Sequence, residues 1–279
     1  PAEALCPAEQ PVPEPPGGRD PYATPGDRLR PRWEETYDPE AVLALWAAGE
    51  EIASGTATHG DDGAAAVSLP ALEAGAYRLV YTTADDFGAE FETSEHLVVA
   101  GDRRTQLALP AMLRFERSTA AVGETARLLV FTGFRAQEMV LEVYRDGSRV
   151  ERRAIGAGRS GVVEFPITTA ERGGFGAALT LVRDHQLIRQ TATVFVPWDD
   201  RRLELGFASF RDRMRPGTRE TFTVTVRGHD GSAVDAETAE LLAYMYDRSL
   251  DLFAPHTPPT TASLYPDRTA VGGLQHNLG

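Results

Sequence analysis

Short segments of alternating apolar and polar residues, separated by turn residues, dominate the sequence after its first 30 residues. The stretch AYRLVYTT places Tyr77, Leu79 and Tyr81 on one face of an extended chain, as a half-buried strand requires. Asp146-Gly147 stands between two alternating arms, and this dipeptide is a strong hairpin signal. Because turn signals recur about every 8 to 12 residues, the sequence predicts an all-β fold of antiparallel β-sandwiches.

Glycine turns precede several alternating strands, which favours successive modules over one large sheet. Two further hairpins are predicted, with turns at Asp184-His185 and at residues 229–231. The chain of 279 residues has room for about two or three domains of ~100 residues. We expect a proline-rich arm over residues 1–30, sandwich modules over residues 31–103 and 104–198, and a third, incomplete module over residues 199–279.

Residues 39–48 are compatible with two structures. Asp38 is a suitable helix N-cap, and Pro39 fits the first helical position. The stretch VLALW also reads as a strand that runs into a turn at Gly49. The surrounding strands favour the strand, which is our prediction, while the local pattern leaves the helix open.

Charge and composition exclude several classes of partner. The chain has 41 acidic and 28 basic residues and a net charge of −13, and its basic residues, all arginine, are scattered. Neither nucleic acid nor an anionic membrane surface is therefore an expected partner. No apolar run approaches the ~20 residues of a membrane-spanning helix. Cys6 is the only cysteine, which excludes an internal disulfide and a zinc site with two or more thiolates, and its role stays open.

No pattern in the sequence promises catalysis. The six histidines are spread out, none of them at the i, i+4 spacing of a helical zinc site, and neither a G-x-S-x-G motif nor a phosphate loop is present. The acidic pairs at 61–62, 85–86 and 199–200 lack the extension of a calcium loop, so they read as turn residues. We expect a protein that is not an enzyme and that holds no cofactor or metal.

A more specific pattern runs from residue 205 to residue 256. A Pro216-Gly217 turn is followed by the strand TFTVTV, a glycine turn, the stretch DAETAELLA and then YDRSLDLF. This order resembles the bacterial branch of the alpha-2-macroglobulin family, and earlier phrases such as STAAVGETARLLVF look like preceding modules, so the resemblance extends from Trp33 to the end. It implies tandem macroglobulin-like sandwiches, of the fibronectin- or immunoglobulin-like kind, in the region that leads to the bait segment.

Members of this family trap proteases, and many carry an internal thioester with the pattern Cys-x-Glu-Gln. The stretch CPAEQ has one residue too many, and it precedes the sandwich modules, whereas the family's thioester follows them in a helical domain. We therefore reject Cys6 as a thioester. The helical thioester domain is absent from these 279 residues, so covalent capture is not expected from this piece alone.

We interpret YDRSLDLF as a structural motif rather than a catalytic one. Tyr246 ends a core strand, and the oxygen atoms of the next polar residues can bond exposed backbone N–H groups. Leu250, Leu252 and Phe253 are expected to cover the open end of a sandwich. The residues of the motif that we single out are Tyr246, Asp247, Ser249, Leu250, Asp251 and Phe253.

Residues 254–279 are rich in proline, threonine and glycine and show no clear period. Such a segment could be a flexible, protease-accessible stretch, with Leu264, Tyr265 and Arg268 as candidate cleavage positions. It could equally be an ordinary linker or the edge of a truncated domain, and the sequence leaves both open.

Two functions from different classes remain. The first is a non-catalytic scaffold, from a fragment of a bacterial macroglobulin-like protein, for broad protease inhibition by trapping. Its partners would be proteases and the other domains of the full-length chain, in the periplasm, at the cell surface or after secretion. No targeting signal is visible, and a chain that starts at Pro1 suggests a fragment or a processed protein. The second is an adhesion or carbohydrate-binding array, for which Trp33, Trp46 and Trp198 could form an aromatic platform, although separate cores explain them more simply.

Overall fold

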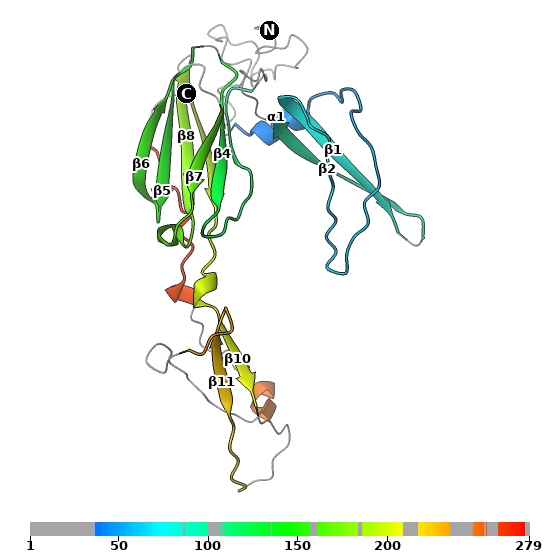
Figure 1. Ribbon diagram of the computed structural model, residues 1–279. Helices are drawn as coiled ribbons and strands as arrows, with labels where there is room; N and C mark the ends of the chain where they lie inside the picture. The colour runs from blue at the N-terminus through cyan, green and yellow to red at the C-terminus, as the bar shows by residue number, and fades with distance from the viewer. Residues whose placement is uncertain are drawn as a thin grey trace.

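The computed structural model describes residues 37–85, 87–99, 107, 109–134, 136–156, 161–183, 186–208, 217–234, 248–253, 255 and 262–276. Within these residues the chain consists mainly of antiparallel strands, with one six-residue α-helix and short 3-10 helices (Figure 1). The predicted all-β, antiparallel sandwich fold is confirmed.

Two antiparallel sheets form a β-sandwich in the middle of the chain (Figure 1). One sheet has the order β3-β4-β7, with β3 at Met112–Phe115, β4 at Thr125–Phe131 and β7 at Gly161–Pro166. The other has the order β6-β5-β8-β9, with β5 at Met139–Arg145, β6 at Ser148–Ile155, β8 at Phe175–Arg183 and β9 at Gln186–Val194. A parallel bridge between Thr119 and Phe195 ties the chain after β3 to the chain after β9.

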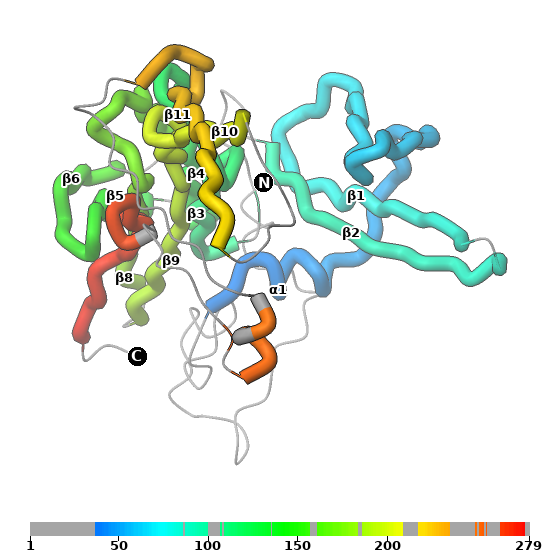
Figure 2. Tube along the Cα trace, turned by 90° about the horizontal axis from the view of Figure 1, so that it is seen from below, coloured from blue at the N-terminus to red at the C-terminus, as the bar shows by residue number. Residues whose placement is uncertain are grey.

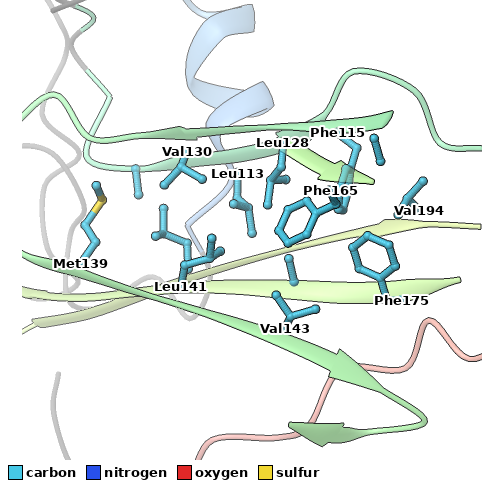
Figure 3. Close-up of a cluster of buried hydrophobic side chains, with 14 of the residues drawn as sticks. Leu113, Phe115, Leu128, Val130, Met139, Leu141, Val143, Phe165, Phe175 and Val194 are labelled. Carbon is cyan, nitrogen blue, oxygen red and sulfur yellow. The ribbon is translucent and has the colours of Figure 1, made fainter. Parts of the chain in front are cut away.

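The core between the two sheets follows from the alternation of each strand. On β4, Ala126, Leu128 and Val130 point inward and are at most 5% exposed. Opposite strands supply a group of aromatic rings, in which the Phe115 and Phe175 centroids are 5.7 Å apart and Phe165 lies 5.3 Å from Phe175 (Figure 3). Edge-to-face and tilted ring contacts of this kind add to the burial of apolar area.

The predicted hairpins of the sandwich are confirmed. Asp146 and Gly147 join β5 to β6 at φ values of 52° and 72°, the positive values that a type I′ turn needs. Strands β8 and β9 pair from Phe175 with Val194 to Arg183 with Gln186, while their predicted turn residues, Asp184 and His185, lie outside the described residues.

The prediction of a strand within residues 39–48 is wrong. Pro39–Ala44 forms helix α1, and the Asp38 carboxylate accepts a hydrogen bond from the Glu40 N–H at 3.0 Å. The helix forms because its apolar side is covered: Leu43, 2% exposed, packs with Met112 and Phe131 against the outer surface of the β3-β4-β7 sheet. Tertiary packing therefore decides between two locally similar alternatives.

The same helix connects the sandwich to a long two-stranded sheet, β1 (Gly75–Ala84) with β2 (Glu90–Val99). Ala76 and Val98 of this sheet pack against the helix cluster. The Arg78 guanidinium donates to the carbonyls of Leu43, Ala44 and Trp46 at 3.1, 3.3 and 2.9 Å, and so binds the carboxyl end of the helix. Arg114 of β3 pairs with Glu40 at 2.9 Å and with Glu95 at 2.7 Å.

A second small sheet follows the sandwich, beyond the 3-10 helix η4 (Asp199–Arg201) in Figure 1. Strands β10 (Leu203–Phe207) and β11 (Val224–Gly228) pair antiparallel, and the predicted turn at 229–231 is confirmed by a 2.9 Å bond from the Gly228 N–H to the Ser232 carbonyl. Three further 3-10 helices lie in the described residues: η3 (Thr169–Glu171), η5 (Arg248–Leu252) and η6 (Ala262–Leu264). The division of the chain into arm and modules stays a prediction.

Candidate functional site

The residues of the YDRSLDLF motif are only partly described. Tyr246 and Asp247 lie outside the described residues, and η5 contains Ser249, Asp251 and the backbone of Leu250. Leu252 and Phe253 are 86% and 87% exposed, so these two side chains do not cover the end of a sandwich as we expected.

The three candidate cleavage positions differ in their surroundings. Leu264, at the end of η6, is 67% exposed. The Tyr265 ring lies 5.9 Å from the Trp198 ring. The Arg268 guanidinium lies 5.3 Å from the centre of the Trp198 ring, and its Nε atom is 3.7 Å from Asp146 Oδ2. Leu264 is therefore open to solvent, while Arg268 is held against the sandwich.

Residues 266–276, which we call the strap, lie on the outside of the β6-β5-β8-β9 sheet. The strap is the red segment beside β5 in Figure 1 and Figure 2, and it lies on the side of this sheet away from the core in Figure 3. Main-chain hydrogen bonds hold it at both edges: the Asp146 and Gly147 N–H groups donate to the carbonyls of Arg268 and Ala270 at 3.0 and 2.9 Å, and the Arg268 N–H donates to the Gly173 carbonyl at 2.9 Å. The strap thus bridges the β5–β6 turn and the loop that precedes β8.

Side chains of the sandwich hold the two ends of the strap. The Trp198 indole N–H donates to the Pro266 carbonyl at 3.2 Å. At the other end, Arg189 of β9 donates to the Gly272 carbonyl at 2.6 Å. Within the strap, the Thr269 N–H donates to the Asp267 carboxylate at 2.8 Å, and hydrogen bonds from Thr269 keep the pKa of Asp267 below its ordinary value.

Two glycines allow the strap to approach the sheet this closely. A Cβ atom on Gly176 of β8 would lie 2.4 Å from Val271 Cγ2 and 2.5 Å from the Thr269 carbonyl oxygen. A Cβ atom on Gly272 would lie 2.7 Å from the Tyr144 ring and 2.8 Å from the Gly147 carbonyl oxygen. Both positions therefore exclude any larger residue unless the strap moves.

Below the strap, the outer face of β5 carries a buried polar pair. Tyr144 and Glu142 are 7% and 9% exposed, and the Tyr144 hydroxyl donates to Glu142 Oε2 at 2.8 Å. Arg149 donates to Glu142 Oε1 at 2.7 Å. Burial alone would raise the pKa of Glu142, but the hydrogen bonds from Arg149 and Tyr144 and the charge of Arg152 hold that pKa below its ordinary value.

The loop before β8 also connects the sandwich to η4. Arg172 is 8% exposed and donates to the Pro197 carbonyl at 2.7 Å and to the Asp199 carboxylate. The hydrogen bond from Arg172 lowers the pKa of Asp199. The next residue, Gly173, donates to the Val196 carbonyl at 2.9 Å and accepts from the strap. One short loop therefore binds the sandwich, η4 and the strap.

The described part of the chain was compared with the side-chain groups that hold metal ions. Among these residues, no group of three His, Cys, Asp or Glu side chains is placed to hold a metal ion. His59 contacts the Tyr81 hydroxyl at 3.3 Å at an exposed position. The described helices also include none with the length and apolar character that a bilayer crossing requires.

Sequence reasoning missed the residues that receive the strap. The sequence indicates only sandwich strands and turns at Gly173, Gly176 and Tyr144, and for Trp198 it favours a separate core over an aromatic platform. One signal was present: Tyr144 is a large aromatic residue at an outward position of β5, where an uncovered sheet would carry a polar side chain.

The comparisons with known proteins agree with this architecture. The sequence model of the alpha-2-macroglobulin bait region domain matches residues 112–251, half of the chain, from the first residue of β3 into η5. No curated protein matches the chain. Members of the matched family are protease inhibitors rather than enzymes and are generally extracellular. The sandwich, the chain that follows it and this match show that the chain belongs to the alpha-2-macroglobulin family.

Proposed function

We propose that the chain is a non-catalytic scaffold of a protease-trapping inhibitor of the bacterial macroglobulin type. It acts outside the cytoplasm, at the cell envelope or after secretion, on proteases that cut it, together with other domains of a longer chain. The observation that carries this proposal is the match to the bait region domain, which ends at residue 251, directly before the exposed pair Leu252 and Phe253.

The exposure of the side chains supports two roles along the chain, a cleavable stretch and a rigid sandwich that presents it. Leu252, Phe253 and Leu264 are 86%, 87% and 67% exposed, on short 3-10 segments and at their ends. Exposed, irregular surface segments are preferred sites of proteolytic cleavage. We place the bait stretch between Leu252 and Tyr265, with the sandwich as the rigid part that presents it. Ser249 and Asp251 keep a structural role at its upstream end.

Limited proteolysis tests this placement. The chain is treated briefly with chymotrypsin-like and elastase-like proteases, and the cleavage sites are read by mass spectrometry. The earliest cuts within residues 37–276 are expected between residues 252 and 265, with the sandwich surviving. A lysine-specific protease is the control, because the chain contains no lysine and must stay whole.

A different cleavage pattern would contradict the proposal. Early cuts inside the sandwich, or a stretch from residue 252 to 265 that resists every protease, would remove the bait assignment. A glycan array then examines the adhesion alternative. Trp46 packs against the helix cluster and Trp198 against Tyr265, so these two tryptophans do not share one platform.

A further inference from the structure

The strap and the surface under it have the properties of a peptide and its binding site. We propose that this surface, formed by the β5–β6 turn, the loop before β8 and Trp198, is a binding site for an extended peptide with the sequence of residues 265–276. In the intact chain the site holds that segment in cis. The same segment binds there when it is no longer joined to the upstream chain.

Main-chain recognition is the first support. The carbonyls of Arg268 and Ala270, two residues apart, accept from adjacent N–H groups of the hairpin turn, and the Arg268 N–H donates to Gly173 on the other side. An extended segment that bonds sheet or turn main chain on both sides gains affinity without depending on the upstream covalent link. The main-chain hydrogen bonds to the site are therefore made by residues of the strap itself.

Side-chain recognition makes the site specific for this segment. The Arg268 guanidinium lies over the Trp198 ring and faces the Asp146 carboxylate, and the Tyr265 ring lies 5.9 Å from the Trp198 ring. The cation–π contact with Trp198 and the charge of Asp146 favour an arginine at position 268 of the peptide. Gly272 must lack a side chain, because Tyr144 and the Gly147 carbonyl occupy the space that a Cβ atom would need.

The surface is organised by bonds that do not involve the strap. Glu142 fixes the Tyr144 hydroxyl at 2.8 Å, the Gly173 N–H is bonded to Val196, and the turn at Asp146 and Gly147 belongs to the β5–β6 hairpin. A site that is already ordered loses little conformational freedom on binding, which favours affinity for a short peptide.

The binding site also suggests what happens after cleavage of the bait stretch, and this role rests on the proposed function. A cut between residues 252 and 264 would leave the downstream end of the chain bound to the sandwich through the strap. Only the upstream end would then be free to move, so the two sides of the cut would separate without the loss of the downstream piece.

A peptide-binding experiment on the full chain tests the site directly. In the variant Arg268→Ala/Gly272→Val, the cis strap can no longer dock and the surface is unchanged. A fluorescein-labelled peptide of residues 262–276 is titrated into this variant and followed by anisotropy. Saturable binding to the double variant is expected. The peptide should bind the wild-type chain at least about tenfold more weakly, because the chain's own strap competes for the site.

Two controls make the result specific. The peptide with Gly272→Val, and the chain with Gly176→Val added to the double variant, should each weaken binding about tenfold or more. The addition of Gly161→Ala instead should leave binding unchanged, because no atom lies within 4 Å of a Cβ at that position. Absence of binding to the double variant, or equal binding to all variants, would overturn the proposal.

A unique cleavage site provides a second measurement in case the double variant does not fold. Ser263 is exposed and the chain contains no lysine, so Ser263→Lys creates a single site for a lysine-specific protease. After cleavage, the fragment from residue 264 onward should elute with the sandwich in native size-exclusion chromatography. Its separation from the sandwich would overturn the proposal, whether or not the chain inhibits any protease.

Discussion

Glu142 shows how a single residue stabilises the surface under the strap. Its carboxylate lies on the outer side of a sheet, yet it is only 9% exposed and receives hydrogen bonds from Tyr144 and Arg149. A buried carboxylate is stable only when such partners compensate the loss of water. The charge on Glu142 therefore matters for the stability of the whole strap-binding surface.

The Glu142→Gln substitution should change the acid stability of the protein. The folded-state pKa of Glu142 is lowered, so its contribution is present above the unfolded-state pKa of about 4.3 and is lost as pH falls through the lower folded value. We expect Glu142→Gln to cost about 1 to 3 kcal/mol at pH 7. Its free energy of unfolding should then fall less steeply than that of the wild type below about pH 4.3.

Denaturant unfolding at several pH values measures this difference. Glu164→Gln is the matched control, because Glu164 forms an exposed pair with Arg127, and such pairs contribute little. Parallel pH profiles for wild type and Glu142→Gln would refute the role assigned to the buried carboxylate.

Gly176→Ala should displace the strap without unfolding the sandwich. The added Cβ would lie 2.4 Å from Val271 Cγ2, a distance that forces the strap to move, at a cost of about 1 to 3 kcal/mol. Faster amide exchange is expected at Asp146 and Gly147, whose N–H groups bond the strap. Gly161→Ala should leave both amides protected, and equal protection in the two variants would mean that the strap adapts.

At the scale of whole elements, local patterns predicted the hairpins but not the covering segments. Asp146-Gly147 specifies its own turn, so the β5–β6 hairpin could be read from the sequence. Helix α1 depends on Phe131, which is distant in sequence and lies on the outer face of the β3-β4-β7 sheet. The run of apolar residues at the end of β4 indicates that both faces of the strand are covered, but not which segment covers the outer one.

The strap escaped prediction for a related reason. Its contacts are made by main-chain atoms, by the polar groups of Trp198 and Arg189, and by the absence of side chains at Gly176 and Gly272. None of these features produces a hydrophobic period. Its proline, threonine and glycine content is typical of flexible segments. The strap is ordered because the surface of the sandwich binds it. Leu264 and Tyr265, which precede the strap, are 67% and 37% exposed, in line with the accessibility that the sequence predicts for them.

The contribution of the N-cap to helix α1 can be tested by mutation of Asp38. Asp38→Ala removes the oxygen that accepts from the Glu40 N–H, and the expected cost is about 0.5 to 2 kcal/mol. Asp38→Asn retains a capping oxygen and should be close to wild type. Amide exchange of Val42, whose N–H bonds the Asp38 carbonyl, reports on the helix. Equal exchange in both variants would show that packing alone holds the helix.

At the scale of the whole molecule, the loop around Arg172 joins the sandwich to the chain that follows. Its guanidinium is buried between the Pro197 carbonyl and the carboxylates of Asp199 and Asp200. These bonds fix η4, and η4 leads directly into β10. The direction in which the chain leaves the sandwich therefore depends on one buried arginine.

Arg172→Ala should loosen this connection. We expect a broader distribution of shapes in small-angle X-ray scattering and a loss of about 1 to 3 kcal/mol in unfolding free energy, because a charge-assisted hydrogen bond is removed. Arg127→Ala, at a 54% exposed side chain, is the control. Unchanged scattering in Arg172→Ala would mean that other contacts orient η4.

The strap also determines how the molecule would respond to mechanical load. A pulling force applied to the last described residues acts on the strap before it acts on the sandwich. Few main-chain bonds hold the strap to the turn and loop, whereas β8 and β9 are joined along nine paired positions. Under tension the strap should therefore peel first and lengthen by about 3.4 Å per residue while the sheets stay folded. The sandwich would therefore stay folded at forces that already detach the strap.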